Sequence, residues 1–284
     1  MAVAAVQRRG ASRTWRTLLS KPTFVIGAVF LLLMIAAAVF APALAPHAPD
    51  SMANDRYVPP GGEHLFGTDN LGRDILSRLL YGARLSLTVG FVVVGLAATA
   101  GTLLGITAGY LRGAVDSFVM RAMDIMLAFP DILLALIIIT MLGPSLVNVM
   151  IALGVAGIPT YTRIARSATL EVSELEFIEA SRALGSRRLL ILLRHVLPNM
   201  FQPILVVATL GVAGAILAAA GLSFIGLGAE PGTPEWGAML SDARTYMRRA
   251  WWMAAIPGIV ITLTVLAINL VGDAVRDALD PRLN

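Results

Sequence analysis

The uncharged stretch ILLALIIITMLGPSLVNVMIALGVAGIPTYT, residues 132–162, decides how many times this chain can cross a membrane. It is 31 residues long, whereas a helix needs about 20 apolar residues to cross a hydrocarbon core about 30 Å thick. The stretch is therefore either one long helix or two helices broken at Gly143-Pro144. Its own residues leave both possibilities open, and the charges in the rest of the chain decide between them.

The positions of arginine and lysine favour two helices. If the basic N-terminus is cytoplasmic and the stretch is split, six spans result and 15 of the 22 Lys and Arg residues lie inside. If the stretch is one helix, every later segment changes sides, and 10 lie inside against 12 outside. Inner segments of membrane proteins carry an excess of these residues. The sequence thus predicts six spans, near residues 23–44, 85–109, 125–143, 145–163, 198–221 and 252–272.

The composition agrees with an all-α membrane protein. Hydrophobic residues make up 57% of the 284 and charged residues 14%, where soluble domains average about 45–50% and about 25%. The chain begins with a basic segment, so the first apolar run could be a cleaved signal peptide. From Thr23 to Ala45 it holds 23 uncharged residues, which exceeds the roughly 7–15 residues of a secretory signal core. We therefore expect a retained first span.

The predicted spans leave a definite organisation for the rest of the chain. It comprises a cytoplasmic tail at 1–22, a first transmembrane helix at 23–44, an external loop at 45–84, and a core at 85–284 with five transmembrane helices, a cytoplasmic loop at 164–197 and an external loop at 222–251.

The cytoplasmic loop is predicted to hold two short helices. Ser173 followed by Glu176 is a capping-box pattern, and the helix they begin reaches Gly185, a candidate C′ glycine. Ser186 is a candidate cap for a second helix, which we expect to end near Pro198, because the residue before proline avoids the helical region. An amphipathic linker lying on the membrane surface is the alternative interpretation of the same residues.

Several classes of catalytic and binding site are missing from the sequence. The single lysine, Lys21, has no G-x-x-x-x-G-K context, so the chain cannot bind ATP through a P-loop. Cysteine is absent, which excludes disulfides and thiolate metal sites. The three histidines, His47, His64 and His195, are scattered, and neither H-E-x-x-H nor G-x-S-x-G occurs. We therefore expect no catalytic residue, no cofactor-binding residue and no metal site.

The spans themselves favour helix packing over ion coupling. Their centres contain no Asp, Glu, Lys, Arg or His, the residues that secondary transporters use to carry ions, although sites built from backbone carbonyls would escape this test. Gly101, Gly105 and Gly109 recur every fourth residue and predict that another helix comes close. Asn148 and Asn269 are expected to form interhelical hydrogen bonds rather than bind substrate.

The cytoplasmic loop also carries a family signature. EASRALG at residues 179–185, with Pro198 thirteen residues after the glycine, resembles the EAA loop of binding-protein-dependent ABC importer permeases. The family pattern is E-A-A-x-x-x-G, nine residues and I-x-L-P; here Ser181 replaces the second alanine and His195 replaces the isoleucine. Both departures keep the acid, the glycine and their spacing to the proline.

Three further stretches are similar to the C-type permease subunit of dipeptide, oligopeptide and nickel importers. They are FGTDNLGRDILSRLLYGARLSLTVG from Phe66, GLSFIGLGAEPGTPEWGAML from Gly221 and NLVGDAVRDALDPRL from Asn269. The resemblance covers roughly residues 20–284, and leaves out the first twenty residues and the loop at 45–62. It implies the type I ABC importer, or MetI-like, permease fold with six transmembrane helices.

The resemblance also implies a function and partners. The chain would form half of the translocation pore of an ATP-driven importer of di- or oligopeptides, in the cytoplasmic membrane of a bacterium or archaeon, with both termini inside. It would be no enzyme and bind no cofactor, because ATP and Mg²⁺ belong to two partner ATPase subunits. A B-type permease subunit and an external solute-binding protein complete the expected complex, and no nucleic acid takes part.

In the family, the EAA loop docks on the ATPase and passes its movement to the membrane helices. The residues to which the resemblance gives this coupling role are Glu179, Ala180, Ser181, Gly185 and Pro198. Four alternatives stay open. The cargo could be nickel or another small solute, or two copies of this chain could form the pore. The protein could also be an ion-coupled secondary transporter or channel, or a membrane enzyme, although the missing nucleophiles and metal ligands oppose the last of these.

Overall fold

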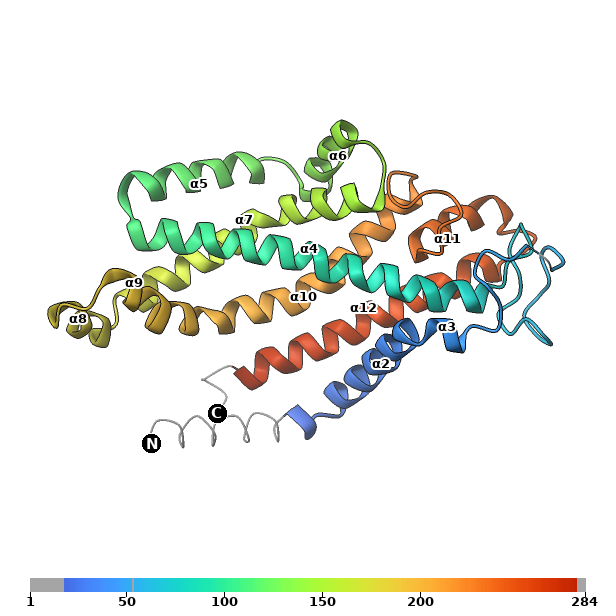
Figure 1. Ribbon diagram of the computed structural model, residues 1–284, viewed down its shortest axis with the longest axis horizontal. Helices are drawn as coiled ribbons and strands as arrows, with labels where there is room; N and C mark the ends of the chain where they lie inside the picture. The colour runs from blue at the N-terminus through green and yellow to red at the C-terminus, as the bar shows by residue number, and fades with distance from the viewer. Residues whose placement is uncertain (1–17, 53, 280–284) are drawn as a thin grey trace. The chain divides into compact units, whose positions relative to one another are not determined.

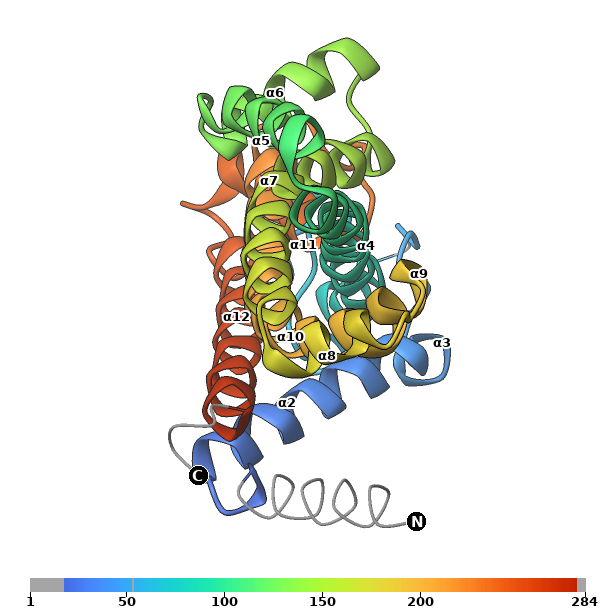
Figure 2. The same ribbon diagram turned by 90° about the vertical axis from the view of Figure 1, so that its left-hand side faces the viewer.

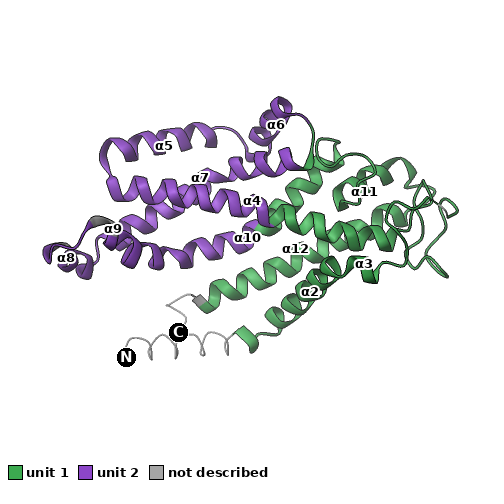
Figure 3. Cartoon of the chain, viewed as in Figure 1, with its two compact units in different colours: residues 1–90, 144–146, 212–284 green, residues 91–143, 147–211 purple. Residues whose placement is uncertain are grey.

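A computed structural model describes residues 18–52 and 54–279, which form helices joined by loops. Within these ranges strand-type pairing is limited to isolated bridges. The tail predicted at 1–22 therefore lies almost wholly outside the described residues. Contacts divide the chain into two compact units (Figure 3). Unit 1 comprises residues 1–90, 144–146 and 212–284, and unit 2 comprises residues 91–143 and 147–211. The continuous helices α4 (Ile75–Leu111) and α10 (Leu197–Phe224) each contribute to both units.

Unit 1 contains the first and the last helix that the structure describes. Its further elements are α2 (Pro22–Val39), α3 (Ala41–Leu44), α11 (Trp236–Ala243), the 3₁₀ turn η2 (Arg244–Tyr246) and α12 (Trp252–Leu279). Figure 1 shows α2, in blue, beside α12, in red. A Cβ on Gly27 of α2 would lie 2.9 Å from the carbonyl oxygen of Ala267, so the two backbones are close. Lys21 and Asp277 form an ion pair of 2.7 Å at the end of this contact.

Unit 2 is built on the contact between α4 and α7 (Leu146–Ser173). A Cβ on Gly101 would lie 2.7 Å from the carbonyl oxygen of Ile158, and one on Gly109 would lie 2.9 Å from the Cβ of Thr169. The predicted close approach at the glycine face is thus confirmed. The other elements are α5 (Gly113–Leu127), α6 (Asp131–Leu142), α8 (Glu176–Ala183), α9 (Arg188–Ile191) and the π-helical turn η1 (Leu192–Val196).

The structure confirms the break in the stretch at 132–162. Helix α6 ends at Leu142 and α7 begins at Leu146, while Asn148 donates to the backbone carbonyls of Leu142 and Gly143. Five described helices are long and apolar enough to cross a membrane: α2, α4, α7, the run Leu192–Phe224 and α12. The pair α5 and α6 passes the same test together, although its two helices meet at 89°. If this pair is one span, six spans result.

Three predicted boundaries are wrong. Residues 125–143 do not form one helix, because Pro130 lacks a backbone N–H and restricts the residue before it, and the chain bends there. Helix α4 begins at Ile75 instead of 85, so the segment predicted as an external loop at 45–84 contains the first turns of a helix. Helix α7 continues to Ser173 instead of 163. In both long helices the charged side chains, which the prediction took as helix ends, find polar partners within the fold.

Candidate functional site

The segment between α7 and α10 is the candidate site, and it forms a short helical excursion. Figures 1 and 2 show α8 and α9, in gold, where α7 ends and α10 begins. A tight turn of the chain joins α8 to α9, and η1 connects α9 to α10. Both neighbouring helices are candidate spans, so whatever touches this segment touches the ends of two membrane helices.

One side of this segment is packed into the protein. Ile178 of α8 and Val196 are 0% exposed, and Ile191 is 1% exposed. These side chains form one apolar cluster with residues of α4, α7 and α10, namely Ile106, Ala165, Val172 and Met200. Burial of a full aliphatic side chain stabilises a fold by about 1.5–3 kcal/mol. The segment is therefore anchored to three long helices.

The opposite side of the segment is open. Glu179 and Ala180 are exposed on α8. Large apolar side chains are also exposed in this segment, namely Phe177 on α8, Leu184 in the turn and Leu193 in η1, and Leu184 is 87% accessible. Apolar side chains grouped on a surface mark sites of interaction with other molecules. The segment thus combines a fixed base with an exposed surface that carries acidic, basic and apolar side chains, since Arg187 and Arg194 are exposed as well.

The turn between α8 and α9 has the geometry predicted for it. Gly185 has φ +80°, the left-handed region, and the backbone N–H of Ser186 donates to the carbonyl of Ser181 at 3.1 Å. This bond spans five residues and closes a Schellman motif with Gly185 at C′. A Cβ at Gly185 would meet nothing within 4 Å, so the need for glycine lies in the backbone conformation alone.

Two predicted helix caps are wrong. Ser173 is the last residue of α7, is 4% exposed, and its hydroxyl has no partner among the described residues. It cannot cap α8, because α7 runs on to this position and α8 starts only at Glu176. The hydroxyl of Ser186 accepts a hydrogen bond from Ser181 at 3.2 Å instead of capping the next helix. The capping-box pattern is weak where a preceding helix can extend through it.

The prediction that a helix ends near Pro198 is also wrong. The helical path continues from Arg188 through η1 into α10. Within η1 the backbone N–H of Leu197 donates to the carbonyl of Leu192, five residues earlier. This wider turn is a π-bulge directly before Pro198, and the helix continues past the proline at this interruption of the regular hydrogen-bond ladder. Pro198 is exposed. Helix α9 and η1 separate it from the turn that holds Ser181 and Gly185.

Ion pairs join α5 to α7, and one joins the residue before α5 to the turn between α7 and α8. Arg166 forms two bonds with Asp116, one of them 2.6 Å between Nη2 and Oδ2, and Arg163 bonds Asp124 at 2.6 Å. Arg112 contacts Glu174 at 3.2 Å, next to the start of α8. Sequence reasoning missed these pairs, because the partners are between 39 and 62 residues apart and no local spacing links them.

The similar stretches from Phe66 and Gly221 meet inside unit 1. Arg73 and Arg78 both donate to the carbonyl of Gly232, at 3.2 and 3.0 Å. Arg73 also lies 3.5 Å from Asp242 of α11. Burial raises the pKa of this carboxyl above its usual value, although the charges of the two arginines act in the opposite direction. These family-like residues therefore hold the fold together, and Arg78 and Asp242 also line a small cavity beside Met239.

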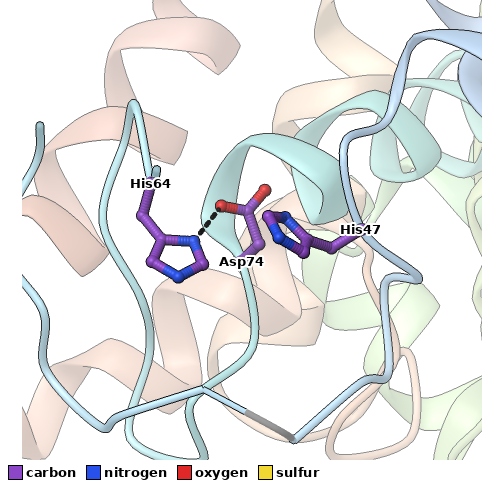
Figure 4. A group of neighbouring side chains, drawn as sticks. All are labelled: His47, His64 and Asp74. Carbon is purple, nitrogen blue, oxygen red and sulfur yellow. Dashed lines mark hydrogen bonds and ion pairs between the residues drawn. The ribbon is translucent and has the colours of Figure 1, made fainter. Parts of the chain in front are cut away.

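One cluster has the composition of a metal site, which the sequence did not suggest. His47, His64 and Asp74 lie together in unit 1, with their ligand atoms within 4.8 Å of one another (Figure 4). The two histidines that are scattered in the sequence are thus neighbours in space. Spacings of 17 and 10 residues carry no recognisable metal-binding pattern, so only the fold brings them together.

Two known protein families match this chain, one over its N-terminal part and one over its C-terminal part. A family described as "Binding-protein-dependent transport system inner membrane component" matches residues 101–284. A second, described as "N-terminal TM domain of oligopeptide transport permease C", matches residues 11–60. The resemblance therefore extends into the first twenty residues and the loop at 45–62, and the boundary drawn from the sequence was too narrow.

Similar proteins and structures agree with these matches. The chain is 45% identical over 276 residues to "Di/tripeptide transport system permease protein DppC" of Pseudomonas aeruginosa (strain UCBPP-PA14), covering 95% of this chain and 91% of that protein. It is 42% identical over 274 residues to "Probable D,D-dipeptide transport system permease protein DdpC" of Escherichia coli (strain K12), covering 96% and 92%. A chain from inward-facing conformations of the MetNI methionine ABC transporter superposes with a TM-score of 0.59 at 21% identity, covering 72% of this chain and 96% of that one.

The structural likeness confirms the predicted MetI-like fold, and the helical multi-pass architecture is confirmed with it. The family model spans more than half of the chain, and the relatives span nearly all of it. This chain belongs to the family of binding-protein-dependent transport system inner membrane components.

Proposed function

We propose that this chain forms half of the pore of an ATP-driven importer of di- and oligopeptides, and that residues 164–197 couple it to an ATPase. The observation that carries the proposal is the two-sided build of α8. Its inner side is locked into a cluster with α4, α7 and α10, while its outer side exposes Glu176, Phe177 and Glu179. Because this chain has no P-loop, ATP must be hydrolysed on another subunit, and the resulting conformational change must reach this chain through a contact surface.

The proposed coupling is mechanical. Force applied to the exposed side of α8 passes through Ile178 into the buried cluster, since close-packed side chains transmit displacement rather than absorb it. The Gly185 turn fixes the direction of α8 relative to α9, and the π-bulge at Leu192–Val196 connects α9 to α10. Glu179, Ala180 and Ser181 are the part of α8 expected to face the ATPase, and Pro198 marks where the loop rejoins a membrane helix.

Short peptides are the proposed cargo because the relatives carry names of di/tripeptide and D,D-dipeptide transport systems. The expected partners are a B-type permease subunit, two ATPase subunits that hold ATP and Mg²⁺, and an external solute-binding protein. The expected orientation places both termini and the 164–197 loop in the cytoplasm of a bacterium.

The test is transport by the reconstituted complex. Vesicles containing this chain, its B-type partner and the ATPases are supplied with the solute-binding protein outside and ATP inside, and uptake of a labelled dipeptide is measured. We expect uptake that requires ATP and stops when the Walker lysine of the ATPases is replaced. Uptake of Ni²⁺ without uptake of peptide would reject the cargo. Peptide uptake driven by an ion gradient without ATPases would reject the coupling.

A further inference from the structure

Three side chains from separate parts of unit 1 converge on one point. His47 follows α3, His64 lies in the loop after it, and Asp74 directly precedes α4. The Nδ1 of His64 lies 2.9 Å from Oδ1 of Asp74, and the centroids of the two imidazole rings are 5.0 Å apart. Figure 4 shows both rings turned toward the carboxylate.

The carboxylate at the centre lacks a permanent positive partner. Asp74 is 1% exposed, and its ion pair in the described part of the chain is with His64 and with no arginine or lysine. Its second oxygen, Oδ2, accepts bonds from the backbone N–H and the hydroxyl of Ser77. The neighbouring buried acid Asp69 is paired with Arg73 at 2.6 Å. Buried carboxylates are paired with a cation or coordinate a metal, and the one ion-pair partner of Asp74 among the described residues is an imidazole.

The second imidazole has an unused nitrogen. Nδ1 of His47 is inaccessible to solvent and has no hydrogen-bond partner among residues 18–52 and 54–279. The backbone N–H of His47 donates to the hydroxyl of Ser77, which is itself bonded to Asp74. The main chain thus holds this ring beside the carboxylate, although the ring makes no hydrogen bond there. A buried nitrogen without a hydrogen-bond partner destabilises a fold, so its presence calls for an explanation.

We propose that His47, His64 and Asp74 bind one divalent transition-metal ion of the zinc class. Two imidazoles and one carboxylate form a set of three protein ligands that leaves a fourth, tetrahedral position for water. Ligand atoms around such an ion are about 3.3 Å apart, as bond lengths of about 2.0–2.2 Å require. The ligand atoms of His64 and Asp74 are already closer together than this. Metal binding would therefore require only the ring of His47 to move closer to them.

The site would fasten the chain between α3 and α4. His47 belongs to the segment leaving α3, and Asp74 starts the first turn of α4, so an ion shared by both ties the two helices at their connection. His47 is half-buried, whereas His64 and Asp74 are buried, so the ion would enter from the side of His47. Because the three ligands come together only in the folded chain, bound metal stabilises the folded state. The stabilisation increases with the ratio of the free metal concentration to the dissociation constant.

Cobalt(II) is a suitable probe, because it takes zinc sites and is coloured. The full chain is purified in detergent with an affinity tag that contains no histidine, stripped with a chelator, and titrated with Co²⁺ followed by competing Zn²⁺. The natural chain has three histidines and no cysteine, so His195→Ala is the matched control. We expect one Co²⁺ per chain with a tetrahedral absorption spectrum in the natural protein and in His195→Ala, and at least tenfold weaker binding in His47→Ala.

A second variant identifies the ligand directly. His47→Cys places a thiolate at the same position, and we expect a new near-ultraviolet Co²⁺–sulfur charge-transfer band that Zn²⁺ removes. Thermal unfolding without metal verifies that His47→Ala remains folded, and added Zn²⁺ should raise the melting temperature of the natural protein and not of this variant. Absence of stoichiometric Co²⁺ binding in the natural chain, or unchanged binding in His47→Ala, would overturn the proposal.

Discussion

The indole N–H of Trp236 donates to the backbone carbonyl of Leu79 at 3.2 Å, which joins α11 to α4 across 157 residues of sequence. Trp236 is fully buried, and its ring lies against Gly82, one turn further along α4. A Cβ on Gly82 would come within 2.8 Å of Trp236 Cδ1 and even closer to the carbonyl oxygen of Pro234. The contact between these helices therefore depends on the absence of a side chain at one position.

Gly82→Ala is expected to destabilise the protein by about 1–3 kcal/mol, the usual cost of overpacking. The clash involves a backbone carbonyl and a buried ring, neither of which can turn away. Gly95→Ala is the control, because it lies in the same helix and its Cβ would meet nothing within 4 Å; there, alanine should stabilise by about 0.5–1 kcal/mol. Thermal unfolding of both variants in detergent tests the pair, and equal melting temperatures would contradict this packing.

How far the sequence predicts this protein depends on the range of the interaction. Runs without charge predict the membrane helices, and the glycine face at Gly101, Gly105 and Gly109 predicts the contact with α7, because both signals are local and periodic. The left-handed turn at Gly185 is predicted for the same reason. The overlong α4 and α7 could not be predicted, since their arginines are accommodated by partners far along the chain.

In the candidate site, too, local patterns are predicted correctly and long-range contacts are not. The EASRALG stretch identifies the loop, but the cap at Ser173 and the helix end at Pro198 are wrong, because α7 extends and a π-bulge admits the proline. The cluster at His47 escapes prediction altogether, since its ligands come from three segments whose spacing matches no motif. Local patterns thus locate functional segments, and tertiary contacts decide their ends and their chemistry.

The orientation of the loop can be tested with single cysteines in a chain that has none. Leu184→Cys, at an exposed position of the turn, is expected to resist a membrane-impermeant maleimide in intact cells and to react after permeabilisation. Glu63→Cys, exposed in the segment between α3 and α4, should react in intact cells. The reason is the excess of Lys and Arg on the side that holds the 164–197 loop. Labelling of position 184 from outside would reverse the orientation.

The exposed surface of α8 and its turn is expected to contribute binding energy for the ATPase. Leu184→Asp places a charge where an apolar contact would form, and we expect at least tenfold weaker association with the ATPase, while the melting temperature of the chain stays within a few degrees. Glu179→Ala should have a smaller effect, since ion pairs at wet surfaces contribute about 0–1 kcal/mol. Pull-down of the ATPase from detergent measures both. An unaffected Leu184→Asp would remove this surface from the interface.

Replacement of Gly185 tests whether the direction of α8 matters for coupling. Its φ of +80° costs other residues about 1–2 kcal/mol, more for β-branched ones and less for asparagine. Because a Cβ there meets nothing within 4 Å, any effect of a substitution comes from the backbone and not from a clash.

Gly185→Val should therefore reorient α8 against α9, abolish ATP-dependent uptake and weaken ATPase association at a normal membrane level. Gly185→Asn, which tolerates this conformation, should keep most of the uptake. If Gly185→Val transports like the natural protein at equal expression, α8 is a surface linker and the coupling proposal fails; if both variants fail equally, the turn needs glycine for a reason other than its φ.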